Sequence, residues 1–401
     1  MIYDHIIVGS GLAALGAAMA TRPEEHVLVL AGNQEGQFNY YNSARTTPCA
    51  FDGFGGLGNA WHGVIPMNLQ GALPISDVDA YASFLSKFYP GNIQSHLGKD
   101  CLFVPWAPVR PMVHWKTMRG TRGDRLRWIA STAQRIQTEG HLSVVHSAEG
   151  ASFKAHQVWV AAGAVQTPFL LSRSFGQGLA RSHISDHALC YVGLVEDGIA
   201  PSVTRHRQGV IFQAFYNDQR DTLYTRRPAR FAYRNLDFGI EQRAVFGMPT
   251  GTAIAKIAKR LSPGLLAEAF FNKMGLFPRA DLYSIYAQTV VEDAYLLQDS
   301  DQPLSVISDN IQAATQLARK QAPFTKLTPS KRNDLYIPGI HLHNSVHLEA
   351  LHALSINTPG SSINVVDASV VRNIGPEHHS FKVMFGAYAS VQRNRETRLS
   401  H

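Results

Sequence analysis

The sequence predicts an α/β fold, and the order of elements at its start carries that prediction. Residues 2–8 form an apolar run without strict alternation, as expected for a strand buried on both faces. An alanine-rich stretch at 12–21 favours a helix, and residues 27–30 favour a second strand. Strand, helix and strand in this order are typical of a parallel sheet with helices packed on its faces.

A glycine-rich turn joins the first strand to the first helix and indicates a dinucleotide site. Gly9 permits a tight bend, Gly11 lets the backbone approach a pyrophosphate, and Ala14 is small enough for close helix–strand packing. The pyrophosphate charge would lie at the helix N-terminus, beside Leu12 and Ala13. A chance glycine turn is the alternative, because this motif is a weak signal outside a strand–helix context. Here the flanking strand and helix supply that context.

One part of the dinucleotide pattern is missing from the sequence. A carboxylate normally ends the second strand and binds the ribose hydroxyls. Here Ala31 and Gly32 follow that strand, and Asn33, Gln34 or Glu35 are the candidates to replace it.

The remaining elements predict a discontinuous nucleotide domain with a second domain inserted into it. Residues 34–70 favour long loops, and strands are expected at 142–146 and 157–161. From about residue 189 the chain changes to short alternating strands, which indicate an antiparallel sheet. We expect further helices at 76–88, 124–138, 253–274, 308–321 and 381–393, and further strands at 190–195, 209–215, 222–226, 282–291 and 363–366.

These elements set the expected domain boundaries. The nucleotide domain is predicted from residues 1–70, 141–188 and 335–401. The substrate or cap domain is predicted from residues 71–140 and 189–334. The chain has 401 residues, which is long enough for roughly two or three packed units.

The charge balance narrows the expected partners. A formal net charge of +7 would suit nucleic acid, an anionic membrane surface or an acidic substrate. Because no dense basic run with interleaved aromatic residues is present, we expect no nucleic-acid partner. The basic helical run at 253–274 leaves membrane-surface contact open, but a helix docked on its own domain is favoured. Oligomeric state is not predicted.

Compartment is predicted from cysteine usage and from the apolar runs. The three cysteines, Cys49, Cys101 and Cys190, are scattered and show neither a disulfide framework nor metal spacing. No apolar run reaches bilayer length, and the start lacks a basic leader. These features predict a cytoplasmic protein.

Several separate blocks share the order and spacing of one known flavoprotein family. Residues 3–11 look like its opening, residues 27–32 resemble its second strand without the acid, and residues 160–172 match a further block. The Ser-Asp-His stretch at 185–187 and the stretch at 363–369 follow in family order. The chain thus resembles the glucose–methanol–choline (GMC) oxidoreductases. The resemblance implies a Rossmann-type FAD-binding domain, GR2/GMC-like, with an inserted substrate domain of antiparallel sheet plus helices.

A second glycine loop at 55–61 is similar to the GMC loop that passes the flavin ring. Some family members attach the flavin through a histidine in this loop, and the equivalent position here is Ala60, with His62 two residues further on. The resemblance therefore implies noncovalent FAD. Beyond the first turn it implies these cofactor contacts: Gly56, Gly58, Asn59, Ala60, Trp61, Val145, Ala162, Gly163, Asp367, Ala368 and His379.

The resemblance also implies the catalytic residues. Family members transfer a hydride from an alcohol carbon to flavin N5, while a histidine paired with histidine or asparagine takes the hydroxyl proton. Counting from Asp367 to the usual position of the partner gives His378, with His379 beside it. Upstream, His341 is the best match to the other family histidine, and His343 competes with it. Imidazole suits this role because its charge changes near neutral pH.

Other readings of these histidines stay open. His343 and His347 are four residues apart and could share a helix face with Glu349 nearby, as in a metal site. No cysteine or second helical pair completes such a set, so no metal is predicted. His187 matches a family position and is expected to be structural.

Three functions are compatible with the sequence. The first is an FAD-dependent alcohol oxidoreductase with a small-molecule alcohol or sugar-like substrate. The second is a redox-neutral or biosynthetic flavoenzyme, such as an isomerase, a lyase or a bacterial cyclisation enzyme. The third is a flavin-binding protein without catalysis, which predicts that His341 and His378 do not converge on the flavin ring.

Overall fold

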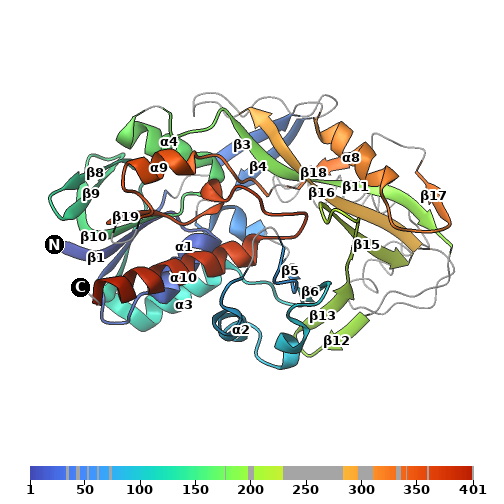
Figure 1. Cartoon of the computed structure of the whole chain (residues 1–401). Helices are drawn as coiled ribbons and strands as arrows, with labels where there is room; N and C mark the ends of the chain where they lie inside the picture. The colour runs from blue at the N-terminus through green and yellow to red at the C-terminus, as the bar shows by residue number, and fades with distance from the viewer. Residues whose placement is uncertain are drawn as a thin grey trace, which may run out of the picture.

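The structure is a computed structural model of the chain. A parallel sheet with helices on both faces lies on the left of Figure 1, and antiparallel sheets lie on the right. The structure describes residues 1–32, 36–41, 46–51, 54–60, 63–71, 75–176, 178–196, 203–228, 283–296, 310–330, 336–339, 341–358 and 361–399.

A seven-stranded sheet forms the first part and has the α/β character that the sequence predicts. Its strands are β1 (Ile2–Val8), β2 (Val27–Leu30), β7 (Leu126–Ile129), β8 (Ala133–Glu139), β9 (Leu142–Ser147), β10 (Ser152–Val160) and β19 (Ile363–Val365). β7, β2, β1, β10 and β19 run parallel in that order. β9 pairs antiparallel with the start of β10, and β8 pairs with β9.

Alternate side chains of this sheet face two different helical layers. The helices are α1 (Leu12–Ala20), α4 (Gly163–Phe175), α9 (Leu348–Ala353) and α10 (Ser380–Leu399). Ile7 and Val29 pack with α1 and α10, whereas Ile6 and Leu28 pack with α4 and α9. Figure 1 shows α1 and α10 below the sheet and α4 and α9 above it. Burial on both faces explains why these strands are apolar throughout.

The prediction of a helix at 124–138 is wrong. The chain leaves α3 (Pro111–Arg122) through η3 (Gly123–Arg125) and then forms β7 and β8. A register shift between Ala133 and Arg135 lets Ala133 and Ile136 both be buried at a spacing of three, which imitates a helix. Both strands lie in the stretch assigned from sequence to the cap domain, yet they belong to the seven-stranded sheet.

Two antiparallel sheets form the second part and confirm the strands expected after residue 189. The six-stranded sheet contains β11 (His183–Val195), β14 (Phe215–Tyr216), β15 (Thr222–Pro228), β16 (Tyr283–Leu296), β17 (Leu327–Pro329) and β18 (Tyr336–Pro338). The four-stranded sheet contains β5 (Ile65–Pro66), β6 (Cys101–Pro105), β12 (Val203–His206) and β13 (Gly209–Gln213). The helix expected at 253–274 lies outside the described residues.

The smaller elements complete the arrangement. Three expected helices are confirmed as α2 (Val78–Ser86), α8 (Asn310–Lys320) and α10. α8 packs against β11 and β16. The stretch expected as loops at 34–70 contains β3 (Gly36–Tyr41), β4 (Thr46–Phe51), η1 (Gly56–Ala60) and β5. The remaining 3-10 turns are η2 (Asn92–His96) and η4 (Ala368–Val370).

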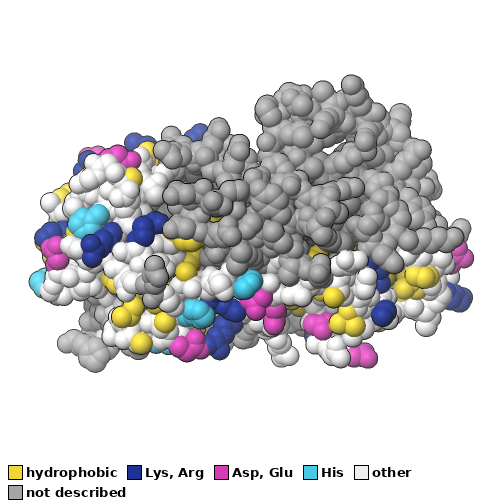
Figure 2. Space-filling model, turned by 90° about the horizontal axis from the view of Figure 1, so that it is seen from above, with side chains coloured by type: hydrophobic (Ala, Val, Ile, Leu, Met, Phe, Trp, Pro, Cys, Tyr) yellow, Lys and Arg dark blue, Asp and Glu magenta, His cyan; other side chains and the backbone are white. Residues whose placement is uncertain are grey.

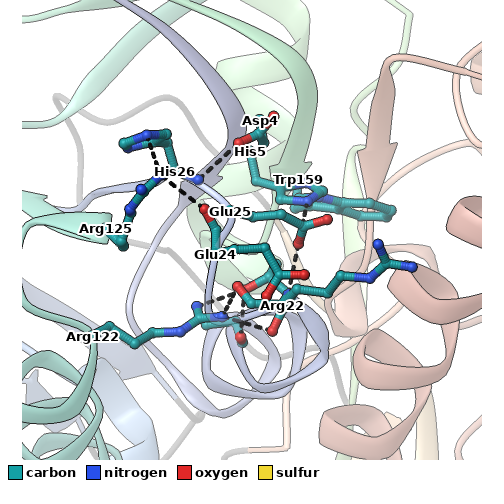
Figure 3. A network of polar contacts seen from close by, with 11 residues as sticks. Asp4, His5, Arg22, Glu24, Glu25, His26, Arg122, Arg125 and Trp159 are labelled. Atoms are coloured by element: carbon teal, nitrogen blue, oxygen red, sulfur yellow. Dashed lines mark hydrogen bonds and ion pairs between the residues drawn. The ribbon is translucent and has the colours of Figure 1, made fainter.

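A polar network fixes the loop between α1 and β2, at the end of the sheet opposite the first glycine turn (Figure 3). Trp159 Nε1 donates to His5 Nδ1 at 3.1 Å, so the His5 proton lies on Nε2, 3.2 Å from the Glu25 carboxylate. Arg122 of α3 donates to the carbonyl oxygen of Thr21 at 2.7 Å. The loop is thereby tied to β1, β10 and α3.

Two of the three cysteines have described side chains, and both are free and buried. Cys101 begins β6, and Cys190 lies in β11. Burial raises the pKa of the Cys101 thiol to about 11 and that of Cys190 to about 12.

The coloured surface in Figure 2 carries basic and acidic side chains interspersed. Within the described ranges, no helix combines the length and apolar character that crossing a bilayer requires.

Candidate functional site

The turn after β1 has the conformation that the sequence predicts. Gly9 has a φ of 109°, and a Cβ there would lie 2.2 Å from the carbonyl oxygen of Ala161. The N–H of Ala161 in turn donates to the carbonyl of Val8 at 2.8 Å. Glycine at position 9 therefore lets the ends of β1 and β10 lie against one another.

α1 begins directly after this turn with an N-terminus that no side chain caps. Gly11 is the N-cap residue, and a Cβ there would meet one described atom within 4 Å, the Gly55 carbonyl oxygen at 3.9 Å. Leu12, Ala13 and Ala14 form the first turn, where helical N–H groups lack intrahelical acceptors. This helix end can receive an anionic group.

The second glycine loop is fixed against the first turn by contacts that the sequence did not predict. Gly55 donates its N–H to Ser10 Oγ at 2.9 Å, and Trp115 Nε1 donates to the Ser10 carbonyl at 2.8 Å. Asn59 Nδ2 donates to the Phe54 carbonyl at 2.6 Å, so Asn59 closes its own loop. A buried tryptophan far along the chain gives no sequence signal for such a contact.

The middle of this loop packs closely on α1 and α3. A Cβ on Gly58 would lie 2.9 Å from Pro111 Cγ and 3.2 Å from Leu12 Cγ. Gly56 begins η1 with a φ of 51°, which favours glycine. Ala60 ends η1, and its side chain, together with all of Trp61 and His62, lies outside what the structure describes.

Asp367 joins the end of β19 to the start of α4. Its Oδ2 accepts hydrogen bonds from Gly163 N at 2.8 Å and from Thr167 Oγ1 at 2.6 Å, and its Oδ1 accepts from Ser369 N at 2.9 Å. Gly163 has a φ of 86°, and Ala162 is the N-cap of α4. The carboxylate thus draws together the strand ends at which the sequence places the cofactor.

The C-terminal end of β2 borders the loop after β7, which in turn contacts a carboxylate of the β9–β10 turn. A Cβ on Gly32 would lie 2.7 Å from Thr132 Oγ1, so the loop after β7 packs against this end of β2. Ser131 in that loop donates a hydrogen bond to the Glu149 carboxylate. Ala148 N donates to the Thr132 carbonyl at 2.8 Å, which holds the β9–β10 turn in place.

The structure places Val145 in the core rather than at the strand ends. It lies in β9 with no exposed surface, packed in the same buried cluster as Ile136, and it pairs with Phe153 near the start of β10. Asn33, Gln34 and Glu35, the candidates to replace the ribose-binding acid, lie outside the described residues.

Five imidazoles gather beside the end of β19. The chain at 341–346 runs between β11 and η4: Ser185 N donates to the His343 carbonyl at 3.1 Å, and Asn344 N donates to the Ala368 carbonyl at 3.1 Å. Neighbouring ring centroids are 5.1–6.3 Å apart. We call this group the histidine cluster: His187, His341, His343, His378 and His379.

Burial divides the histidine cluster into two groups. His187 and His343 have no exposed surface and His379 is 5% exposed, whereas His341 and His378 are partly exposed. Burial lowers the pKa of His343 to about 4 and the pKa values of His187 and His379 well below the usual range. The three buried rings are therefore neutral at pH 7.

His343, the competing candidate base, already makes a hydrogen bond through one ring nitrogen. Its Nδ1 lies 3.0 Å from the carbonyl oxygen of His341, and a carbonyl only accepts, so Nδ1 carries the proton. Its Nε2 is buried and has no hydrogen-bond partner among the described residues, and the same is true of His379 Nδ1. Neither ring is open to an incoming ligand from solvent.

His187 contacts His341 and three further groups. His187 Nδ1 lies 3.1 Å from His341 Nδ1 and 2.9 Å from Gln288 Nε2. His187 Nε2 lies 2.5 Å from the carbonyl oxygen of Gly375. The backbone carbonyl of His187 accepts from Gly339 N at 2.6 Å. The sequence indicated His187 only through its family-like position.

A buried ion pair adjoins the cluster and was missed from sequence. Glu377 and Lys382 have side-chain exposures of 4% and 2%, and Lys382 Nζ lies 3.1 Å from Glu377 Oε2. Tyr216 donates its hydroxyl to the other oxygen of Glu377 at 2.7 Å. The signal was present, since Glu377 precedes His378 and Lys382 is a single charge in an apolar stretch of α10.

The alternative metal site does not have the geometry that it requires. His347 is the N-cap of α9, while His343 lies before the helix in a β-bridge, so the two do not share a helix face. Among the described residues, no group of histidine, cysteine and acidic side chains is arranged to hold a metal ion. His352 is exposed on α9, away from these contacts.

Comparison with known proteins shows the fold. No family model matches the sequence, and comparison with curated proteins gives no match. Pyridoxine 4-oxidase from Mesorbium loti is similar in structure, with a TM-score of 0.53, 14% identity, and 98% of this chain and 99% of that chain covered. A fungal aryl-alcohol oxidase has a TM-score of 0.52 and 12% identity, with 99% of each chain covered.

A formate oxidase is also similar to this chain in structure. A variant of the enzyme from Aspergillus oryzae RIB40, studied for FAD modification, has a TM-score of 0.53 and 10% identity, with 100% of this chain and 98% of that chain covered. These identities are low, so the likeness is one of architecture. The chain has the fold of the FAD-binding GMC oxidoreductases, a Rossmann-type parallel sheet joined to antiparallel sheets.

Proposed function

We propose that this chain is an FAD-dependent oxidoreductase that oxidises a hydroxyl group of a small or sugar-like alcohol. One observation carries the proposal. His341 and His378, the two residues expected to be catalytic, have ring centroids 5.2 Å apart and are the members of the histidine cluster that are not buried. A flavin-binding protein without catalysis predicts that the two imidazoles do not converge on the flavin, and their closeness to one another supports the catalytic alternative.

The residues at the strand ends fit FAD. Gly9 and Gly11 keep side chains away from the turn, and the uncapped N-terminus of α1 offers N–H groups to a pyrophosphate. Gly56, Gly58 and the remaining residues of η1 would lie along the same cofactor. When bound, FAD supplies the hydride acceptor. Noncovalent binding is proposed because alanine, at position 60, cannot form the bond that a histidine forms there.

The histidine cluster supplies the acid–base chemistry. His341 is proposed to take the hydroxyl proton, and His378 to hydrogen-bond the same oxygen. The alcohol loses one hydride from carbon and one proton from oxygen, and leaves as a carbonyl compound. The buried, neutral His187, His343 and His379 add no positive charge that would oppose protonation of the base.

An anaerobic reduction experiment tests the proposal. The purified protein, supplied with FAD, is mixed without oxygen with pyridoxine, benzyl alcohol, formate and simple sugars, the first three chosen from the names of the structural neighbours. Bleaching of the flavin absorption by an alcohol in this panel is expected. Formate, which has no carbinol carbon, distinguishes alcohol oxidation from oxidation of a carboxylate.

Other outcomes identify the other functions. A protein that stays colourless after incubation with FAD contradicts the cofactor assignment. Product formation without net bleaching would indicate the redox-neutral isomerase, lyase or cyclisation reaction. Flavin that binds tightly but is reduced by no alcohol in a wide screen would favour a flavin-binding protein without catalysis.

A further inference from the structure

We infer that His187 is a positioning residue that holds His341 in the tautomer with its proton on Nδ1, leaving Nε2 free of a proton. The inference deepens the proposed function and rests on it for its catalytic consequence. The tautomer itself is a property of the protein that can be measured without turnover. His341 and His187 are 154 residues apart in sequence and meet only in the fold.

The argument starts at the carbonyl of Gly375. A carbonyl oxygen can only accept, and it lies 2.5 Å from His187 Nε2, so Nε2 must carry a proton. His187 has no exposed surface, and burial together with the neighbouring His343 lowers its pKa well below the usual range. A neutral ring with its proton on Nε2 has an unprotonated Nδ1, which acts as an acceptor.

Two donors meet this acceptor. Gln288 Nε2 lies 2.9 Å from His187 Nδ1, and the amide orientation with nitrogen toward the ring is the one that allows a hydrogen bond. His341 Nδ1 lies 3.1 Å from the same atom. The two donors share the single lone pair of His187 Nδ1. Because His187 Nδ1 has no proton to give, the proton in its contact with His341 Nδ1 belongs to His341. The neutral His341 ring then has its unprotonated nitrogen at Nε2.

The backbone reinforces this orientation. Asp186, the residue before His187 in β11, is fully buried, and its Oδ1 accepts from His341 N at 2.6 Å. The two rings are 5.1 Å apart and meet edge to face at 74°. The pair Asp186 and His187 therefore fixes both the main chain and the ring of His341. The charged or titratable groups facing these rings include His343, His378 and His379.

Two substitutions at position 187 separate the two hydrogen bonds of its ring. In His187→Asn, the amide oxygen can take the place of Nδ1 and accept from His341, while the bond to Gly375 is lost. In His187→Gln, the longer side chain can donate to the Gly375 carbonyl, while the acceptor for His341 is lost. Asparagine should therefore preserve the tautomer and glutamine should not.

Nuclear magnetic resonance of the FAD-supplied protein, labelled with ¹⁵N in histidine, provides the direct test. The His341 signals are assigned by their loss in His341→Asn. We expect His341 to carry its proton on Nδ1 in the wild type and in His187→Asn, and to shift toward the Nε2-protonated form in His187→Gln. A wild-type His341 protonated on Nε2 would overturn the inference, whatever the protein catalyses.

Anaerobic flavin reduction by the alcohol that bleaches the wild type provides the second readout. We expect the reduction rate constant to fall roughly 10–100-fold in His187→Gln and by much less in His187→Asn, with FAD affinity unchanged in both. The opposite order, or equal losses in both variants, would mean that the Gly375 bond or general packing matters instead. If no alcohol reduces the flavin, the proposed function fails while the resonance result still decides the tautomer.

Discussion

His341 and His378 are the residues on which the proposed chemistry depends, and they differ from their neighbours in exposure. His187, His343 and His379 are buried and neutral, whereas His341 and His378 retain access to solvent. A base must reach the substrate oxygen directly, so the buried rings can act only through their neighbours. Single substitutions should therefore separate the two exposed rings from the others.

Replacing the proposed base tests this separation. His341→Asn should lower the anaerobic flavin reduction rate by roughly 10²–10⁴-fold, because the proposed base for the hydroxyl proton is removed. His378→Asn should cost less, since asparagine can still hydrogen-bond the substrate oxygen. The measurement is stopped-flow reduction with the FAD content of each variant determined beforehand.

His352→Asn is the matched control, because His352 is an exposed histidine on α9. Its reduction rate should equal that of the wild type. If His341→Asn reduces as fast as this control, the base lies elsewhere.

The resemblance to the GMC oxidoreductases indicates these two residues as candidates, but it does not indicate the residues that support them. His378 is counted from Asp367 at the family spacing, and His341 is matched to a short family pattern. The contact of His341 with His187 depends on β11 and the 341–346 segment lying together. Gln288 contacts the His187 ring because β16 pairs with β11. The two residues are 101 positions apart in the sequence, so local patterns cannot show this contact.

At the scale of elements, α1 and α10 approach one another closely at Gly16. A Cβ on Gly16 would lie 2.1 Å from the Met384 carbonyl oxygen, in the backbone of α10. Backbone cannot move aside as a side chain can, so the helices would have to separate. The end of α1 that faces the proposed pyrophosphate would be displaced with them.

Gly16→Ala should therefore destabilise the protein, by roughly 1–3 kcal/mol. Gly120→Ala in α3 is the matched control, because a Cβ there meets no atom within 4 Å in the described structure. Alanine is the better helix former, so Gly120→Ala should stabilise by up to about 1 kcal/mol. Denaturant unfolding of both variants gives the comparison, and equal effects would contradict the close approach.

Glu149, in the turn between β9 and β10, contacts the β7–β8 loop that borders the end of β2, where the dinucleotide pattern lacks its acid. If Glu149 holds the ribose, Glu149→Gln should raise the FAD dissociation constant by about tenfold, as expected for loss of a charged hydrogen bond. Flavin fluorescence titration measures this constant. Glu139→Gln removes an exposed carboxylate on β8 that pairs with Lys154 of β10 across β9, and it should leave the constant unchanged.

The elements themselves were largely predictable, and the failure has a local cause. β1, α1 and β2 follow from apolar runs and one glycine turn. The stretch at 124–138 was misassigned because a register shift in β8 spaces Ala133 and Ile136 like a helix face. The pairing of β7 with β2 makes the start of this stretch a strand rather than a helix, and it is a contact between residues about a hundred positions apart.

At the scale of the whole molecule, the buried imidazoles couple stability to pH. The pKa of His343 falls from 6.5 to about 4 on folding, so the unfolded chain binds more protons between these values. Stability contributed by His343 is complete above pH 6.5 and is lost as the pH falls toward 4, by about 3 kcal/mol in all. The lowered pKa values of His187 and His379 act in the same direction.

Thermal unfolding between pH 7 and pH 4.5 measures this dependence. The melting temperature of the wild type should fall steadily on acidification. His343→Gln, whose side chain does not titrate, should lose less over the same interval even if it starts lower. Parallel curves for the two proteins would show that His343 is not kept neutral by burial.

The alkylation rate of a buried thiol measures how often the strand that carries it opens. The raised pKa values of Cys101 and Cys190 leave almost no thiolate at neutral pH. Cys190 has no exposed surface, so an alkylating agent can modify it only when β11 opens. Because Cys190 lies in the strand that carries His187, its alkylation rate reports openings around the histidine cluster without any substrate in hand.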